Sequence, residues 1–494
     1  MDDKSELIHA FKVWDGHVNH PYTISFIDDR ITCPHCRKVK RLPTISQDNV
    51  AHTNLIVDIQ NQNAEENKMS EEKQDKKLAK DLLVFKQGQD SLLTDLDTID
   101  EGIQKIKNKL SDLTNIKNLH FLLGAGASSD AIPAMAALLS IVEERVNSDQ
   151  TKNELDTMPG QLSHDDLKQR YMLAKDNSLN NLENILGTFY SKKAYLKGIG
   201  ESDGLNDYLI RLIEQQIYSS INIDLTSEGA SKSLTIYKNL YQKLSLRNKD
   251  LSRVNVFTTN NDLLSETALG YLNINYNNGF SSGLSRTFNP ARFTYTYSRK
   301  IDSGMEKYEP LENMVYLYKL HGSISWIESE DNSFFNIKEV DVKPGNPSNN
   351  NNVLIYPTPL KQNKSLGAPY ADLIREFKNR LLLQHAVLIV IGYSFSDEHI
   401  NNAIYSALAS NSSLSVVIFG NYPNENLTKL TDRRIYQVSG VVEEEDDFGL
   451  PEQRRIHYFD YIVDNFIPDL DRSKDVEILE DFIKSVKSIR GDLG

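Results

Sequence analysis

Four short polar segments follow apolar, strand-like runs in this 494-residue chain, and each carries glycines or side chains suited to binding or catalysis. In chain order they cover residues 124–128, 258–262, 319–323 and 392–397. In an open parallel sheet, ligands bind in the crevice outside the carboxyl ends of the strands. We therefore expect glycines, an asparagine amide and a histidine imidazole to meet in one crevice.

The first segment places two glycines where a strand turns toward a helix. The backbone amides of Gly124, Ala125 and Gly126 can approach a pyrophosphate at the start of that helix. Ser128 adds a hydroxyl to the same turn. Ser129 stands where the usual dinucleotide fingerprint has its third glycine. Because tight turns after strands are common, this turn alone does not establish a nucleotide site.

The second and third segments supply an amide and an imidazole at strand ends. Asn260 can hold a ribose hydroxyl and a water, and His321 is suited to act as a base near neutral pH. Thr259 and Asp262 flank the asparagine, and Asp262 would equally serve as a helix cap, which is the alternative meaning of this turn. A lone histidine is more often structural, but here Asn260 and His321 both follow strands of one expected sheet.

The fourth segment combines a glycine with hydroxyl groups. Gly392 permits close approach of the backbone, and Ser394 offers a hydroxyl to a ribose or a phosphate. Ser396 or Asp397 is expected to cap the helix that follows.

Strands and helices alternate along the last three quarters of the chain. The apolar runs predicted as strands are 119–123, 254–258, 315–320, 353–356, 386–391 and 414–419. With helical stretches such as 370–384 between them, they predict an α/β fold with a doubly wound, parallel, Rossmann-like sheet over residues 117–494. Residues about 131–250 are mostly helical in pattern and far longer than one crossover needs, so we expect a helical insertion over the site.

Residues 1–45 hold both cysteines of the chain in a pattern typical of zinc modules. His17 and His20 are followed by Cys33 and Cys36, a spacing suited to a tetrahedral site. Four protein ligands would close the zinc shell, so the metal would be structural. Two surface histidines beside a chance Cys-x2-Cys are the alternative, and His35 could replace one of the histidines. The basic residues after Cys36 would form a solvated loop or touch nucleic acid.

Residues 46–116 are predicted to form a charged linker followed by a coiled-coil helix. Apolar residues recur at alternating spacings of four and three from Leu78 to Leu113, with Gln89 as the only polar member. Gly88 and Gly102 each lower helix propensity by about 1 kcal/mol relative to alanine. Such a stripe indicates that one face of the helix is buried, but it does not indicate what packs against that face. Self-association into a homo-oligomer and packing against the chain's own α/β domain both stay open.

Composition limits the class of protein. The length suggests two or three units, and 39% hydrophobic residues support a substantial core. A formal net charge of −14 argues against extensive nucleic-acid coating, although a local basic patch is compatible with it. Two cysteines exclude a disulfide framework. Because no segment resembles a signal peptide or a membrane span, we expect a cytoplasmic protein.

On these segments, most of residues 117–494 resembles the sirtuin-like NAD hydrolases of bacterial antiphage defence. Residues 124–128 look like the sirtuin glycine turn, and Ile132-Pro133 resembles the Ile-Pro that follows it. Residues 259–262 are similar to the Thr-x-Asn-x-Asp element, and His321-Gly322 is similar to the sirtuin His-Gly. The resemblance implies that NAD is the substrate and that the asparagine and the histidine of these elements are catalytic.

Two departures separate the chain from sirtuin deacylases. Met135-Ala136 replaces the Phe-Arg that follows the Ile-Pro, and no Cys-x-x-Cys pairs follow His321. The deacylase zinc module is therefore absent, which puts a peptide substrate in doubt. The implied reaction is hydrolysis of the nicotinamide–ribose bond to give nicotinamide and ADP-ribose. The resemblance also suggests an assembly, with a HerA-type ATPase or another defence partner.

Two alternatives remain open. One is an NAD-dependent protein deacylase or ADP-ribosyltransferase, which acyl-lysine turnover would favour. The other is a non-catalytic scaffold that senses nucleotides or binds nucleic acid through the zinc module and the coiled coil, which NAD binding without nicotinamide release would favour.

Overall fold

The chain divides into two compact units, Met1–Lys73 and Gln74–Gly494, in a computed structural model. The residues described are the strands within 23–41 and the ranges 82–158, 162–245, 247–248, 250–301, 306–329, 337–344, 352–354, 369–445 and 451–468. In the first unit, β1 (Thr23–Ser25), β2 (Arg30–Thr32) and β3 (Val39–Arg41) form an antiparallel sheet. The expected zinc ligands His17, His20, Cys33 and Cys36 lie outside the described residues.

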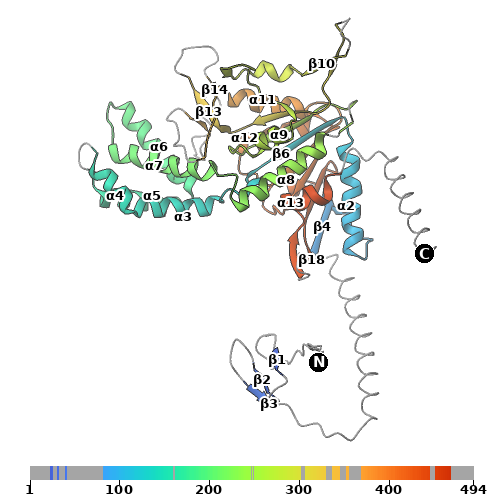
Figure 1. Cartoon of the computed structure of the whole chain (residues 1–494), viewed down its shortest axis with the longest axis horizontal. Coiled ribbons are helices and arrows are strands. Elements are labelled where there is room, and N and C mark those ends of the chain that lie inside the picture. The colour runs from blue at the N-terminus through green and yellow to red at the C-terminus, as the bar shows by residue number, and fades with distance from the viewer. Residues whose placement is uncertain are drawn as a thin grey trace, which may run out of the picture. The chain divides into compact units, whose positions relative to one another are not determined.

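The second unit is built on a ten-stranded sheet with a parallel centre (Figure 1). Its path runs β5-β4-β18-β17-β16-β6-β7-β12-β8, and β19 pairs with β18. The bounds are β4 (Leu83–Gln87), β5 (Asp90–Ser91), β6 (Asn118–Leu123), β7 (Val254–Thr258), β8 (Asn275–Asn277), β12 (Met314–Lys319), β16 (Ala386–Ile391), β17 (Ser415–Phe419), β18 (Ile435–Glu445) and β19 (Pro451–Arg455). The strands from β18 to β8 are parallel, and β4, β5 and β19 join antiparallel.

The order in which the chain adds strands to the sheet reverses between β6 and β16. From β6 it proceeds to β7 and β12 on one side, and it later returns to fill β16, β17 and β18 on the other. Every residue of β6 and β16 is buried, as expected for strands covered on both faces. The predicted Rossmann-like parallel sheet is confirmed, and its switch point lies between these two strands.

Helices cover both faces of the sheet, so alternate strand residues enter two separate cores. One core includes Phe121 and Val256 and packs under α2 (Ile99–Thr114), α8 (Glu228–Ser245), α9 (Leu264–Tyr271), α13 (Phe459–Tyr461) and η4 (Ile462–Phe466). The other includes Leu122 and Phe257 and packs under α11 (Tyr370–Leu381) and α12 (Glu398–Ser410).

A smaller antiparallel sheet follows the parallel one at β12. It has the order β15-β13-β14-β9, with β13 (Gly322–Glu328), β14 (Ile337–Glu339), β15 (Asn352–Leu354) and β9 (Arg286–Thr287). The run 353–356, expected as a strand of the parallel sheet, thus overlaps β15 of this second sheet. Short elements nearby are η2 (Pro290–Thr294), β10 (Ser298–Lys300) and β11 (Tyr308–Pro310), and η3 (Leu427–Lys429) precedes β18.

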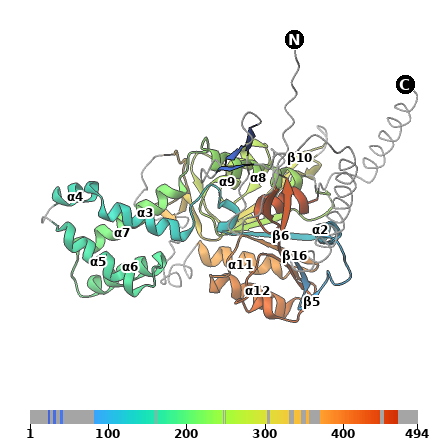
Figure 2. The same cartoon turned by 90° about the horizontal axis from the view of Figure 1, so that it is seen from below.

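Five helices form a lobe whose core also includes Ile324 of β13. They are α3 (Met135–Asn147), α4 (Asp149–Asp156), α5 (His164–Asn177), α6 (Leu182–Gly198) and α7 (Gly204–Ile221). Figures 1 and 2 both show this group extending from one end of the sheet. The expected helical segment of about 131–250 corresponds to these helices and α8, but α8 packs on the sheet instead. Among helices of the described residues, none has the length and hydrophobicity that a membrane span requires.

The continuous helix predicted from Leu78 to Leu113 is wrong between residues 83 and 91, where β4 and β5 form a hairpin. Leu83 and Phe85 are buried on alternate positions of β4, and of these two only Phe85 belonged to the stripe. Gly88 turns the hairpin with a φ of +61°. Gln89, expected to set a coiled-coil register, donates to the backbone carbonyls of Thr428 and Leu430 at 2.9 and 3.1 Å.

The second half of the stripe is helical but faces its own domain. A capping box of Thr98 and Glu101 starts α2. Ile106, Leu110 and Leu113 are buried in the core shared with the sheet and η4. The structure therefore supports internal packing for this part of the stripe, which was one of the two open alternatives.

We predict that Leu110→Ala destabilises the protein by about 3 kcal/mol, because it leaves a cavity in a core where Leu110 is 1% exposed. Thermal melting should show the loss, and light scattering should show an unchanged mass. Lys107→Ala, on the exposed face of the same helix, is the matched control and should melt as wild type does. A reduced mass with unchanged melting for Leu110→Ala would instead show that the stripe joins subunits.

Candidate active site

A cavity of about 510 Å³ lies at the carboxyl ends of β6, β7, β12 and β16. The predicted site residues that line it are Ala125, Gly126, Ser128, Thr259, Asn260, Asp262, His321 and Ser394. Apolar side chains of the lobe form another part of the wall, among them Leu138, Ile217 and Ile221. Four segments that are far apart in the sequence thus meet in one cavity, at the switch point of the sheet.

The two remaining predicted residues, Gly124 and Gly392, do not line this cavity but lie against each other. The amide of Gly124 donates to the Ile391 carbonyl and that of Gly126 to the Gly392 carbonyl, both at 2.9 Å. A Cβ on Gly124 would lie 2.4 Å from the Gly392 oxygen, and Gly392 has a φ of +64°. These glycines allow the turn after β6 and the turn after β16 to pack closely against each other. The amides of Gly124 and Gly126, which were expected to bind pyrophosphate, instead donate hydrogen bonds between the two turns.

Ser128 lines the cavity and holds three polar side chains together. Its hydroxyl donates to Asp262 Oδ2 at 2.9 Å, and its oxygen accepts from Asn260 Nδ2 at 3.0 Å. The Tyr237 hydroxyl, at 3.0 Å, is the third partner. A serine hydroxyl donates once and accepts twice, so Ser128 is fully occupied and Tyr237 must be a donor.

The protonation of Tyr237 agrees with this arrangement. Burial, and then the charge of Asp262, raise the pKa of Tyr237 well above the usual phenol value. The phenol therefore keeps its proton and donates it to Ser128. Ser128 is 1% exposed and Asp262 is 3% exposed. Both residues are placed to orient Asn260 from below, and a direct contact with a phosphate is not available to the occupied Ser128 hydroxyl.

Asn261 joins the asparagine segment to the histidine segment. Its Nδ2 donates to the carbonyls of His321 and Gly322 at 2.7 and 3.1 Å, and its carbonyl accepts from the amide of Ile324 at 3.0 Å. The buried Lys319 donates to the Asp262 carbonyl. The end of β7 and the end of β12 are therefore fixed relative to each other by several hydrogen bonds.

A buried ion pair supports the same corner. Lys319 Nζ lies 3.3 Å from Glu266 Oε1, and the two side chains are 1% and 9% exposed. Burial raises the pKa of Glu266, and the positive charge of Lys319 opposes that rise. Lys319 therefore links α9 to the loop that carries Asn260.

His321 is held by a helix cap. Its Nε2 lies 3.0 Å from Asp397 Oδ2, and the two side chains are 14% and 8% exposed. The other oxygen of Asp397 accepts from the amides of His399 and Ile400 at the start of α12, at 3.0 and 3.3 Å. Because a carboxylate only accepts, Nε2 of a neutral His321 carries the proton and Nδ1 is the basic nitrogen.

Other predicted residues have less constrained positions. The amide of Thr259 donates to the Leu123 carbonyl at 3.1 Å. Ser394 is exposed, and its hydroxyl donates to Ser396 at 3.1 Å. Asp397, expected only as a helix cap, proves to contact His321 as well. Within the described ranges, no cluster of three or more histidine, cysteine, aspartate or glutamate side chains could hold a metal ion.

Sequence reasoning missed two residues that support the site. Tyr237 lies 109 positions from Ser128, so no local pattern connects them. Lys319 offered a usable signal, since a lysine at the end of an otherwise apolar run must find a buried acceptor or an acid.

Three similar solved structures are all described as Sir2 proteins. A Sir2 homologue–NAD complex is 14% identical, with 67% of this chain and 87% of that chain covered and a TM-score of 0.29. A structure on the mechanism and regulation of Sir2 enzymes is 10% identical, with 75% and 98% covered and a TM-score of 0.32. A mutant Sir2 homologue with ADP-ribose is 12% identical, with 74% and 96% covered and a TM-score of 0.30. None of the curated protein sequences compared with the chain matches it.

Residues 254–441 match the family model of the SIR2-like domain. The match begins at β7 and includes Asn260, His321 and Asp397, whereas the glycine turn at 124–128 precedes it. The region that is similar to this family therefore supplies the amide and the imidazole of the cavity.

Proposed function

We propose that the protein hydrolyses the bond between nicotinamide and ribose in NAD, releasing nicotinamide and ADP-ribose. One observation carries the proposal: Asn260 and His321 line one cavity, together with the glycine turn, at the switch point of a parallel sheet. Dinucleotides bind at such switch points. The SIR2-like match, which includes both residues, supports an NAD-dependent activity.

The chemistry requires stabilised positive charge and a base. When the bond from ribose C1′ to the pyridinium nitrogen breaks, the electron pair goes to nitrogen, and nicotinamide leaves as a neutral molecule. The developing positive charge on the ribose is then quenched by a water oxygen, which loses a proton. Nδ1 of His321 would take a proton from a ribose hydroxyl or from that water. Asn260, held through Nδ2 by Ser128, would offer Oδ1 to orient the ribose and the water.

Water is favoured over an acyl-lysine peptide as the acceptor. The chain has only two cysteines, Cys33 and Cys36, and both precede the α/β domain. It therefore lacks the Cys-x-x-Cys pairs that build the small zinc module of sirtuin deacylases beside their peptide cleft. Deacylation or ADP-ribosyl transfer is the second candidate, and acyl-lysine turnover would support it.

We further propose that this reaction depletes NAD as an effector of antiphage defence, as the resemblance implies. An NAD hydrolase without control would poison its own cell, so the activity should stay low until a signal or partner releases it. Nicotinamide release by the purified protein, with and without the products of neighbouring genes such as a HerA-type ATPase, tests this role.

We predict that Asn260→Ala and His321→Ala each lower the rate of NAD hydrolysis by at least about 100-fold, because the first loses the group that orients ribose and water and the second loses the proposed base. Chromatography of ADP-ribose measures the rate. Asn108→Ala, at an exposed asparagine of α2, is the control and should retain wild-type activity and melting. Wild-type turnover in either cavity variant would contradict the assignment of that residue.

We predict that Asp397→Asn keeps the cap of α12 but slows hydrolysis. Asparagine caps helices as well as aspartate does, so melting should change little. The loss of the carboxylate beside Nε2 should lower kcat roughly tenfold or more while KM for NAD stays near its wild-type value. Asp397→Ala loses the cap as well, so it should also be less stable by about 1 kcal/mol.

If Asp397 acted only as a cap, the asparagine variant would restore kcat fully. That result would remove the proposed role of Asp397 in positioning the histidine.

A further inference from the structure

A separate cavity, of about 300 Å³, lies beside the edge strand β8. Its wall is formed by β8 and the loop that follows it, by β9, by η2 and by residues 295–297. It shares no lining residue with the cavity that holds Asn260 and His321. Small-molecule sites have volumes of roughly 300–1,000 Å³. This cavity is therefore large enough for a small ligand of its own.

Two buried asparagines fix the wall of this cavity beside β8. Asn277 Nδ2 donates to the carbonyls of Arg292 and Tyr295 at 2.7 and 3.2 Å. Asn278 Nδ2 donates to Glu339 Oε1 at 2.9 Å. Both asparagines are buried, so their hydrogen bonds are protected from water. The segment that carries Arg292 and Tyr295 is therefore held in place by the protein itself.

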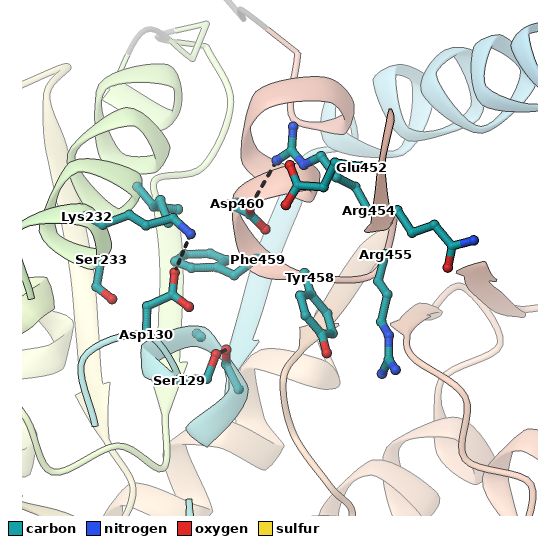
Figure 3. A pocket seen from close by; sticks show the side chains of 14 residues that line it. Ser129, Asp130, Lys232, Ser233, Glu452, Arg454, Arg455, Tyr458, Phe459 and Asp460 are labelled. Atoms are coloured by element: carbon teal, nitrogen blue, oxygen red, sulfur yellow. Dashed lines mark hydrogen bonds and ion pairs between the residues drawn. The ribbon is translucent and has the colours of Figure 1, made fainter. Parts of the chain in front are cut away.

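One of the two arginines in the wall has its charge matched. Arg286 Nη1 lies 2.6 Å from Glu339 Oε2, and the glutamate side chain is 8% exposed. Burial raises the pKa of Glu339 to about 7, and the charge of Arg286 opposes that rise. A cation is matched in the same way in a different cavity, next to α8, where Lys232 lies 3.0 Å from Asp130 (Figure 3). Cations paired in this way hold the protein together and are not offered to a ligand.

The other arginine, Arg292, is different, because no acidic side chain in the described part of the chain pairs with it. Its guanidinium carbon lies 5.9 Å from the centroid of the Tyr295 ring. Tyr295 and Tyr297 are 58% and 44% exposed. An open aromatic face stacks on a nucleobase, and an unpaired guanidinium binds phosphate oxygens. Two exposed rings and one cation on the wall of a single cavity are therefore suited to a base that carries a phosphate.

We propose that this cavity binds a free nucleotide, with the base against Tyr295 or Tyr297 and the phosphate on Arg292. The formal net charge of −14 favours a small ligand over a nucleic-acid strand, because an acidic chain repels the many phosphates of a strand. The inference goes beyond the proposed function and does not rest on it, since the two cavities have no residue in common.

The test is calorimetric titration of GMP into the full chain, because GMP lacks the adenosine of NAD and stacking accepts any base. The wild type should bind GMP at least about tenfold more tightly than inorganic phosphate, which cannot stack. Tyr295→Ala and Arg292→Ala should each weaken GMP binding about tenfold, which is the size of one stacking or charge-assisted contact. Tyr195→Ala, at a 67% exposed tyrosine of α6, and Lys107→Ala, at an exposed lysine of α2, are the matched controls and should bind GMP as the wild type does.

Photolabelling with an azido derivative of GMP locates the bound nucleotide. Mass spectrometry should find the label on the peptide that contains Tyr295 and Tyr297. A label confined to residues 124–128 or 392–397 would overturn the inference, and so would an unchanged GMP affinity in both variants or GMP binding no tighter than phosphate binding. A short single-stranded oligonucleotide that binds more than about tenfold tighter than GMP would overturn it too, because the ligand would then be a nucleic acid.

Discussion

The close contact between two backbone turns is the constraint on which the rest of the site depends. The turn after β6 lies against the turn after β16, with Gly124 and Gly126 on one side and Gly392 on the other, and a Cβ at any of the three would overlap backbone atoms. This contact places Ser128 of the first turn and Asp397 of the second at the same cavity. Ser128 then orients Asn260, and Asp397 orients His321, so the placement of both side chains depends on three glycines.

Much of this arrangement could be predicted from the sequence because buried parallel strands are continuous apolar runs. The runs 119–123, 254–258, 315–320 and 386–391 fall on β6, β7, β12 and β16, and the rule that ligands bind at carboxyl strand ends then brings Asn260 and His321 together. The hairpin of β4 and β5 could not be predicted in this way, because the apolar run Leu82–Phe85 fits both a helical stripe through Leu82 and Phe85 and a strand that buries Leu83 and Phe85. Tyr237 escaped prediction since its partner is distant in sequence.

Two charged side chains of the site, Asp397 and Lys319, each make one interaction that stabilises the fold and a second interaction within the site. One carboxylate, Asp397, accepts from two amides of α12 with one oxygen and contacts His321 with the other. One buried lysine, Lys319, satisfies the carbonyl of Asp262 and pairs with Glu266. In each case the interaction that stabilises the fold also fixes the position of Asn260 or His321, or of a residue beside it.

The position of Tyr237 on α8 has an evolutionary consequence. The core of the lobe of α3 to α7 does not include α8, which returns the chain to the sheet and carries the phenol that reaches Ser128. Sequence change within the lobe can therefore remodel the wall at Leu138 and Ile217 while the hydrogen bond between Tyr237 and Ser128 stays in place. Descendants of this chain could exchange or resize the lobe and acquire new ligand selectivity, provided that α8 keeps its register on the sheet.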